Sequence, residues 1–258
     1  MQLHAMEAEE LILSFPVTRQ VTESCVSNVV GWVKAGERDK YVACANPYSL
    51  VVAMHDPEFE AAIRSADLIT PDGFGVILAS RILGGEIHER VTGMDIFMGV
   101  SDMLNTQGGY SCFFLGSTSD TLQKIADRFK RDYPNLTLAG TYSPPFKAAF
   151  SDADNQMMIE AINEAEPDVL WVGMTAPKQE IWIHQNKDKL NVSVIGAVGA
   201  AFDFYAGTVR RSPHWFQKHG LEWMPRLLQQ PRRLWRRTFV SAPMFLLHVV
   251  QQRLADTT

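Results

Sequence analysis

The sequence has 258 residues, of which 46% are hydrophobic and 21% charged, and a net charge of −5, as is typical of a soluble globular protein. Its three cysteines are far apart and form no CxxC pair, which excludes a disulfide framework, indicates no zinc site and favours a reducing cytosol. No stretch approaches the roughly 18 apolar residues of a membrane span, and no basic segment leading into an apolar run indicates a signal peptide.

Along the chain, the spacing of apolar residues predicts strands and helices that alternate every 20–30 residues. After a short strand or hairpin within residues 1–19, the predicted strands are 41–45, 68–70, 111–115, 136–139, 168–173 and 192–196. The predicted helices are 21–33, 50–54, 58–65, 76–82, one ending at 104, 121–132, 154–166, and one ending near 189. This alternation predicts a Rossmann-like α/β fold, with a mostly parallel sheet and helices on both faces.

One stretch, residues 66–82, combines a buried strand, a Pro-Asp-Gly turn and a helix. Open α/β sheets present reactive groups where such strands end. Asp72 is expected at this turn beside Gly73, where the backbone can approach a ligand closely. The alternative is that Asp72 only caps the helix that follows, which is a common role for aspartate.

Polar residues follow other predicted strands as well. They are Asn46, Ser117 after Gly116, and the cluster Lys178-Gln179-Glu180. Because the carboxyl ends of parallel strands line one crevice, these residues and Asp72 predict a ligand site there, although any one of them alone could be a cap or a turn residue.

Several well-known motifs are missing from the sequence. It has no GxxxxGK[ST] loop, no GxGxxG after the first strand, no GxSxG elbow and no HExxH pair. Their absence weakens the ATPase, dinucleotide-binding, serine hydrolase and zinc-enzyme interpretations. A DxD pair, Asp152 and Asp154, resembles the metal-binding pair of sugar-nucleotide enzymes, but its place before a helix favours capping, and we predict no metal site.

The C-terminal part differs in charge from the rest. Residues 209–258 hold nine Lys and Arg against two acidic residues, so the other residues sum to −12. We therefore predict a catalytic body at 1–208 and a basic amphipathic appendage at 209–258, broken into short helices by Pro225, Pro231 and Pro243. An acidic body argues against nucleic acid as a partner. The appendage suits an anionic membrane surface or packing on its own body or on a second subunit, and these alternatives stay open.

Six blocks of the sequence together resemble one enzyme family. They lie at residues 45–47 (ANP), 70–76 (TPDGFGV), 89–95 (ERVTGMD), 173–180 (GMTAPKQE), 199–203 (GAAFD) and 220–223 (GLEW). They look like the WecG/TagA/CpsF glycosyltransferases (glycosyltransferase family 26) over about residues 40–240. The resemblance implies an inverting, metal-independent transfer, without a cofactor, from a UDP-sugar to a polyprenyl-diphosphate-linked sugar. It also implies peripheral attachment to the cytoplasmic face of the inner membrane, during assembly of a bacterial surface polysaccharide.

The resemblance also implies roles for individual residues. Asp72 matches the family's proposed base, and Gln179, flanked by Lys178 and Glu180, lies in the block associated with the donor. The family has arginines that are thought to close over the site and contact diphosphate. The residues of this chain that match them are Arg226, Arg233 and Arg236. Further substrate-binding candidates are Cys44, Asn46, Gly73, Arg90 and Gly116.

One departure from the family pattern concerns the early strand. Many members have Thr-x-Asn there, whereas this chain has Cys44-Ala45-Asn46, so a hydroxyl contact is lost or replaced by a weak thiol donor. The donor sugar therefore stays open among N-acetylmannosamine, its uronic acid and glucose. Alternatives to a transferase are an NAD-dependent nucleotide-sugar epimerase and a membrane-associated binding or scaffold protein. A homo-oligomer is possible.

Overall fold

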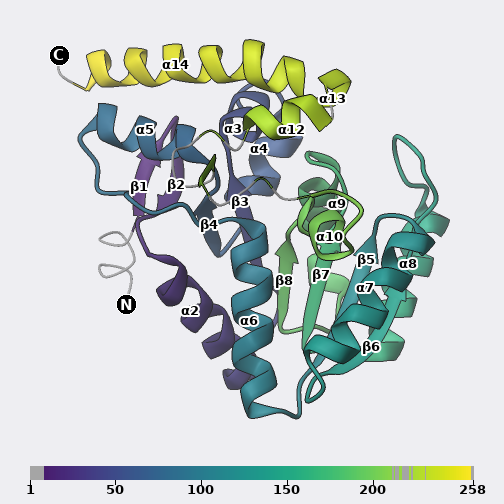
Figure 1. The fold of residues 1–258 in the computed structure, drawn as a ribbon. Helices are drawn as coiled ribbons and strands as arrows, with labels where there is room; N and C mark the ends of the chain where they lie inside the picture. The colour runs from purple at the N-terminus through teal and green to yellow at the C-terminus, as the bar shows by residue number, and fades with distance from the viewer. Residues whose placement is uncertain are drawn as a thin grey trace.

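The computed structural model describes residues 9–210, 212, 215–216, 221, 223–229 and 231–256. A six-stranded sheet, parallel throughout, runs through the centre of the protein in the order β4-β3-β8-β7-β5-β6 (Figure 1). Its strands are β3 (Lys40–Ala45), β4 (Leu68–Pro71), β5 (Ser111–Gly116), β6 (Thr137–Tyr142), β7 (Val169–Gly173) and β8 (Val194–Ala197). The predicted fold class is confirmed. The expected N-terminal hairpin is a separate antiparallel pair, β1 (Glu9–Ile12) and β2 (Phe15–Thr18).

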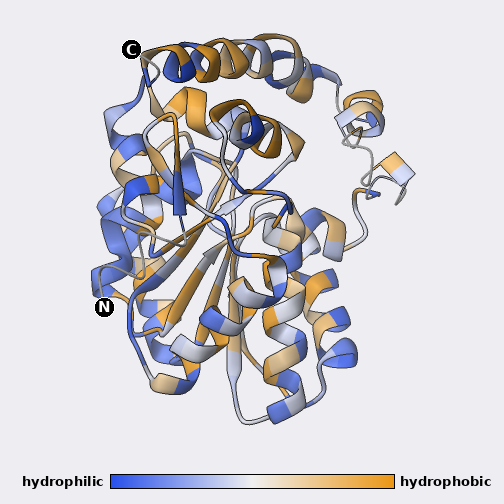
Figure 2. Cartoon of the chain, turned by 90° about the vertical axis from the view of Figure 1, so that its left-hand side faces the viewer, coloured by the Kyte–Doolittle hydropathy of each residue, from blue (hydrophilic) through white to orange (hydrophobic). Residues whose placement is uncertain are grey.

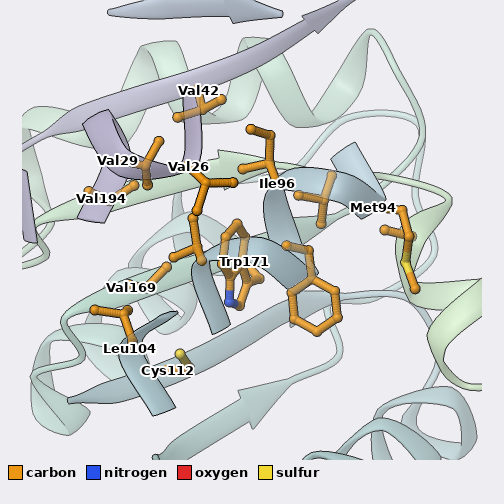
Figure 3. Packing of buried hydrophobic residues seen from close by; sticks show 14 of the residues in the cluster. Val26, Val29, Val42, Met94, Ile96, Leu104, Cys112, Val169, Trp171 and Val194 are labelled. Carbon is orange, nitrogen blue, oxygen red and sulfur yellow. The ribbon is translucent and has the colours of Figure 1, made fainter. Parts of the chain in front are cut away.

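One face of the sheet is covered by four helices, which bury an aromatic cluster. The helices are α2 (Thr22–Ala35), α6 (Gly93–Gln107), α7 (Ser119–Asp132) and α10 (Ala201–Tyr205). Trp171 of β7 lies in the middle of this cluster (Figure 3), with its ring 5.3 Å from that of Phe97. Edge-to-face aromatic packing of this kind adds to the free energy gained from burial. The short helix α10 was not predicted as a helix, because five residues carry too little periodicity.

The opposite face is covered by α8 (Asp152–Ala165) and α9 (Lys178–Asn186), which is followed by a 3₁₀ turn at Lys187–Lys189. Leu170 and Val172 of β7 point to this face, whereas Val169 and Trp171 point to the aromatic cluster. This alternation with a period of two, with every residue of β7 buried, is that of a strand covered on both sides.

A third cluster joins the hairpin to helices beside β3 and β4. It contains α3 (Pro47–Ala53), α4 (Pro57–Arg64), α5 (Phe74–Leu83) and α14 (Ala242–Ala255). Phe245 and Val249 of α14 are completely buried in it. The side-chain amide of Gln252 accepts from Leu13 N at 2.8 Å and donates to Leu11 O at 3.0 Å. The last helix therefore packs on its own chain, which was one of the open alternatives.

The C-terminal helices are α12 (Trp223–Gln229), α13 (Pro231–Arg236), a π-helical turn (Arg237–Ser241) and α14. The expected break at Pro243 is wrong, because the chain stays helical from Pro231 to Ala255. The π-helical turn lies directly before Pro243, where its wider hydrogen-bond pattern accommodates a residue that has no N–H. Around α14, hydrophobic and hydrophilic residues alternate (Figure 2). Within the described residues, no helix is long and apolar enough to cross a membrane.

Candidate active site

Asp72 lies directly after β4, at the carboxyl end of the sheet. Its backbone N–H donates to Ala45 O at 2.7 Å, which fixes the turn against the end of β3. The N-cap of α5 is Gly73, with φ of 103°, a conformation that favours glycine. Gly73 itself has no side chain with which to cap α5. Asp72 is half-buried at this turn, whose backbone is fixed on either side of it.

Asn46 follows β3 and caps α3. Its Oδ1 accepts from Ser49 N at 3.0 Å, and its own N–H donates to Ser49 Oγ at 2.8 Å. This capping box uses the oxygen of the amide and so sets the direction of Nδ2, a hydrogen-bond donor. Capping and ligand binding are therefore compatible roles for this residue.

Cys44 pairs with Thr70 across β3 and β4. The Thr70 hydroxyl lies 3.4 Å from the Cys44 sulfur and also 3.4 Å from Ala43 O. Burial raises the pKa of the Cys44 thiol well above its usual range, and the charges of Asp72, Glu180 and Asp95 raise it further. Cys44 is therefore a neutral thiol near the end of β3, close to the carboxylates that raise its pKa.

Arg90 comes to the same edge through the loop between α5 and α6. Val91 N donates to Pro71 O at 2.9 Å, so the residue after Arg90 is fixed at the end of β4. Asp95, one turn into α6, forms a capping box with Thr92. The half-buried side chain of Arg90 thus lies close in the chain to the strand that ends before Asp72.

At β5 and β7, backbone alone forms the end of the sheet. Gly116 pairs with Gly173, and Ser117 N donates to Gly173 O at 3.1 Å. A Cβ on Gly116 would lie 2.6 Å from Gly173 O, and its φ is +120°. Only glycine satisfies both conditions, and the result is a surface to which a ligand can come close.

Gln179 and Glu180 are both 4% exposed at the start of α9. Gln179 Oε1 accepts from Met174 N at 3.2 Å, and its Nε2 donates to Glu180 Oε1 at 2.8 Å. Gln179 thereby fixes the loop that follows β7. Burial raises the pKa of Glu180 to about 7, against the lowering effects of the Gln179 hydrogen bond, its own backbone and the Arg237 charge.

Lys178 is directed away from this group. Its amine donates to Lys147 O at 2.5 Å and lies 3.7 Å from the ring centroid of Phe150, both in the loop before α8. Burial lowers the pKa of this amine. Lys178 therefore fixes the loop between β6 and α8 to the start of α9.

The predicted C-terminal arginines are only partly described. Arg226 lies in α12 and Arg233 in α13, but their side chains fall outside the described residues. Arg236 is exposed, with its guanidinium 6.0 Å from the Trp235 ring. Arg237, in contrast, is half-buried, 4.1 Å from the ring of Tyr48 on α3. It brings the start of the π-helical turn to the carboxyl edge of the sheet.

Five helices of at least nine residues begin at this edge, and α8, which follows β6, is one of them. The other four are α5, α6, α7 and α9. Because the N-terminus of a helix carries partial positive charge and unpaired N–H groups, this edge favours an anionic ligand such as a diphosphate.

The DxD pair has a structural role. Ser151 and Asp154 form a capping box at the start of α8, and Lys147 Nζ lies 2.8 Å from Asp154 Oδ2. The hydrogen bond from Lys147, followed by those from Ser151, lowers the pKa of Asp154 to about 2. The expectation of capping is confirmed. In the part of the chain that the structure describes, no three His, Cys, Asp or Glu residues are grouped to hold a metal ion.

Sequence reasoning missed three neighbours of the site: Tyr41, Tyr48 and Arg237. The Tyr41 hydroxyl is buried without a hydrogen-bond partner among the described residues, and the charge of Glu180 adds to the burial that raises its pKa. In the sequence, Tyr41 fits the apolar pattern of β3, so no signal distinguishes it as a residue near the site. The only sequence signal for Arg237 as a site residue is that it directly follows Arg236, which the family motif does match.

Comparison with known proteins gives one consistent result. A model of the family described as "Glycosyl transferase WecG/TagA/CpsF family" matches residues 11–258. The chain is 34% identical over 216 residues to an N-acetylglucosaminyldiphosphoundecaprenol N-acetyl-beta-D-mannosaminyltransferase of Bacillus spizizenii, with 84% of this chain and 80% of that protein covered. Proteins with the same name from Bacillus subtilis and Staphylococcus aureus (strain MW2) are 29% and 26% identical, over 82% and 83% of this chain and 79% and 80% of their own lengths.

Proposed function

The chain belongs to the WecG/TagA/CpsF family of glycosyltransferases, and from this premise we propose which sugar it transfers and how. The donor is UDP-N-acetylmannosamine, and the acceptor is N-acetylglucosamine linked through diphosphate to a polyprenol such as undecaprenol. Support for both comes from the names of relatives up to 34% identical. The product is a lipid-linked disaccharide for a bacterial surface polymer.

The position of Asp72 carries the proposed mechanism. Its carboxylate takes the proton from the acceptor hydroxyl as that oxygen attacks the anomeric carbon. The new C–O bond forms while the bond from the anomeric carbon to the UDP oxygen breaks, and UDP leaves with the electron pair. One base and an attack from the face opposite the leaving group give inversion. The support is the place of Asp72 directly after β4, where its backbone N–H donates to Ala45 O and fixes the turn at the carboxyl end of the sheet.

The departing diphosphate is stabilised by positive charge from the protein, in a metal-independent reaction. The N-termini of the helices that begin at this edge supply partial charges. Arg226, Arg233 and Arg236 supply full charges, and the exposed position of Arg236 leaves it accessible to an incoming diphosphate. Arg90 adds a further cation near the end of β4.

Donor recognition uses residues at the ends of strands on both sides of the sheet. Gln179, with Lys178 and Glu180 beside it, forms the turn that receives the donor, and Gly116 allows close approach at β5. Asn46 Nδ2 and the Cys44 thiol contact the donor or acceptor next to Asp72, and Gly73 gives the backbone its open turn there. These assignments rest on the family motifs and on the shared location of the residues.

The C-terminal helices attach the protein peripherally to the cytoplasmic face of the membrane. Large apolar side chains are exposed on them; these are Trp223, Met224, Leu228, Trp235, Phe239, Val240, Met244, Leu247, Val250 and Leu254. Exposed arginines, Arg232 and Arg236, lie on the same segment. This combination suits an interface with anionic lipid, where a polyprenyl acceptor would be embedded. The body at 1–208 then carries the chemistry, and the appendage at 209–258 brings it to the acceptor.

UDP release tests this function. We expect release from UDP-N-acetylmannosamine, in the presence of a short-chain polyprenyl-diphosphate N-acetylglucosamine, and little from UDP-glucose or UDP-N-acetylmannosaminuronic acid. Preference for either of the latter would overturn the donor assignment. Release from none of them, together with vesicle binding, would favour a scaffold protein, and a tightly held nicotinamide would favour an epimerase.

A further inference from the structure

Glu180 is a buried carboxylate between the proposed donor turn and the C-terminal helices. Its Oε1 accepts from Gln179 Nε2 at 2.8 Å. Its Oε2 is buried and has no hydrogen-bond partner among the residues that the structure describes. Because a buried carboxylate oxygen without a hydrogen bond costs free energy, the ionised form needs a nearby positive charge.

Arg237 supplies such a charge from the C-terminal segment. It is the first residue of the π-helical turn, and its guanidinium lies 4.1 Å from the ring of Tyr48. Its charge lowers the pKa of Glu180, against the larger effect of burial. Arg237 therefore contacts α3 through Tyr48, and its charge favours the ionised form of Glu180 on α9. π-Helical turns of this kind are frequent at functional sites.

Three other titratable groups near Glu180 do not supply this charge: Tyr41 and Cys44 of β3, and Lys178 of α9. His184 lies one turn further along α9, with its Nδ1 buried and without a hydrogen-bond partner among the described residues. Burial, with the charge of Glu180 adding to it, raises the pKa of both Tyr41 and Cys44, so both are neutral. The amine of Lys178 is bonded to the loop before α8.

We infer that Glu180 is a positioning residue that couples the donor turn to the docking of the C-terminal helices through Arg237. The inference rests on the proposed function, because that function assigns Gln179 to the donor. With the helices docked, Arg237 favours ionised Glu180, which accepts from the Gln179 amide and so holds Gln179 Oε1 on Met174 N. Coupling is reciprocal, so a nucleotide that orders this turn must equally favour the docked helices.

UDP affinity in a double-mutant cycle tests the coupling. We expect Glu180→Gln and Arg237→Gln each to weaken UDP binding roughly tenfold by calorimetry. The double variant should be no weaker than the weaker of the two, because both remove the same interaction. Arg131→Gln, an exposed arginine in the last turn of α7, is the matched control and should bind like the wild type. A double variant whose loss equals the product of the single losses would overturn the coupling.

Hydrogen exchange of the backbone in residues 231–241 tests the docking without nucleotide. After correction for intrinsic rates, protection in the wild type should increase as the pH rises through about 7, where Glu180 loses its proton. In Glu180→Gln this increase should be absent, whereas a purely structural role would leave it in place. If Glu180→Gln does not fold, Arg237→Gln should show the same loss. Failure of every variant and the wild type to bind UDP would count against the proposed function, whereas an unchanged pH dependence would count against the coupling.

Discussion

The parallel sheet and the C-terminal helices bury their apolar residues to very different degrees. In β7 and β8 every residue is buried, whereas in the described part of residues 223–256 only Leu234, Phe245 and Val249 are buried hydrophobic residues. The sheet is therefore ordered by its own core, and the C-terminal helices are held by a few contacts at one end. From this difference we expect residues of the body to fix the geometry of the proposed reaction, and the helices to supply charge and a surface.

The largest expected effect comes from removing Asp72, the proposed base, which belongs to the body. Asp72→Asn keeps the shape of the side chain but removes its ability to take a proton, so we expect kcat to fall by about 10²–10⁴-fold. UDP affinity and the melting temperature should change little. Asp188→Asn, an exposed residue of the 3₁₀ turn near the opposite edge of the sheet, is the control. Near-normal turnover by Asp72→Asn would remove this residue as the base.

The few contacts of the C-terminal helices can be broken at Phe245. This side chain is fully buried between α14 and the body, so Phe245→Ala should lower the free energy of unfolding by about 3–5 kcal/mol in urea titrations. Leu247→Ala, 57% exposed on the same helix, should cost much less.

Removing everything after Val209 should leave a folded but less stable body with very little activity, because the proposed arginines are lost. Full activity in that truncated protein would show that the helices have no part in catalysis.

Glu180 lies where the two regions meet, and its pKa gives a pH-dependent prediction. Burial raises this pKa from 4.5 to about 7, so between these values the folded protein binds a proton that the unfolded chain has lost. The free energy of unfolding contributed by this group therefore falls as the pH rises through that window. In the wild type this group should lower the free energy of unfolding by on the order of 2 kcal/mol between pH 4.5 and 7. In Glu180→Gln this decrease should be absent. A wild type and variant with parallel stability curves would contradict this assignment.

The smallest effect is expected from the exposed apolar side chains. Leu228→Ser and Phe239→Ser should each weaken binding to anionic vesicles by several-fold. Each substitution removes apolar area from the interface and so costs about 1–2 kcal/mol of binding free energy. Stability in solution should not change. Met157→Ser, an exposed position on α8 of the body, is the matched control in the sedimentation assay. Equal losses in all three variants would mean that the C-terminal helices are not the attachment surface.

Local patterns predicted the body well and the C-terminal helices poorly. The strand, turn and helix around Asp72 combine a short apolar run, a Pro-Asp-Gly turn and helical spacing, and each of these signals is local. The predicted helix break at Pro243 was wrong, because the π-helical turn that precedes this proline leaves no signature in the sequence. That turn also changes the helical phase, so spacing alone cannot tell which of Arg236 and Arg237 faces the body. The buried contact between Gln179 and Glu180 depends on tertiary packing, which periodicity does not encode.

The place of β8 in the sheet has a consequence for how the protein acquires its structure. β3 and β4 form one half-sheet, and β7, β5 and β6 form another, and only β8 pairs with both. Asp72 and Asn46 follow strands of the first half, whereas Gly116 ends β5 and Gln179 follows β7 in the second half. During synthesis the two halves can each assemble early, but they have no common strand until residue 197 has emerged. Joining them across such a long sequence separation should make this step slow, and an incomplete chain would expose two unpaired strand edges prone to aggregation.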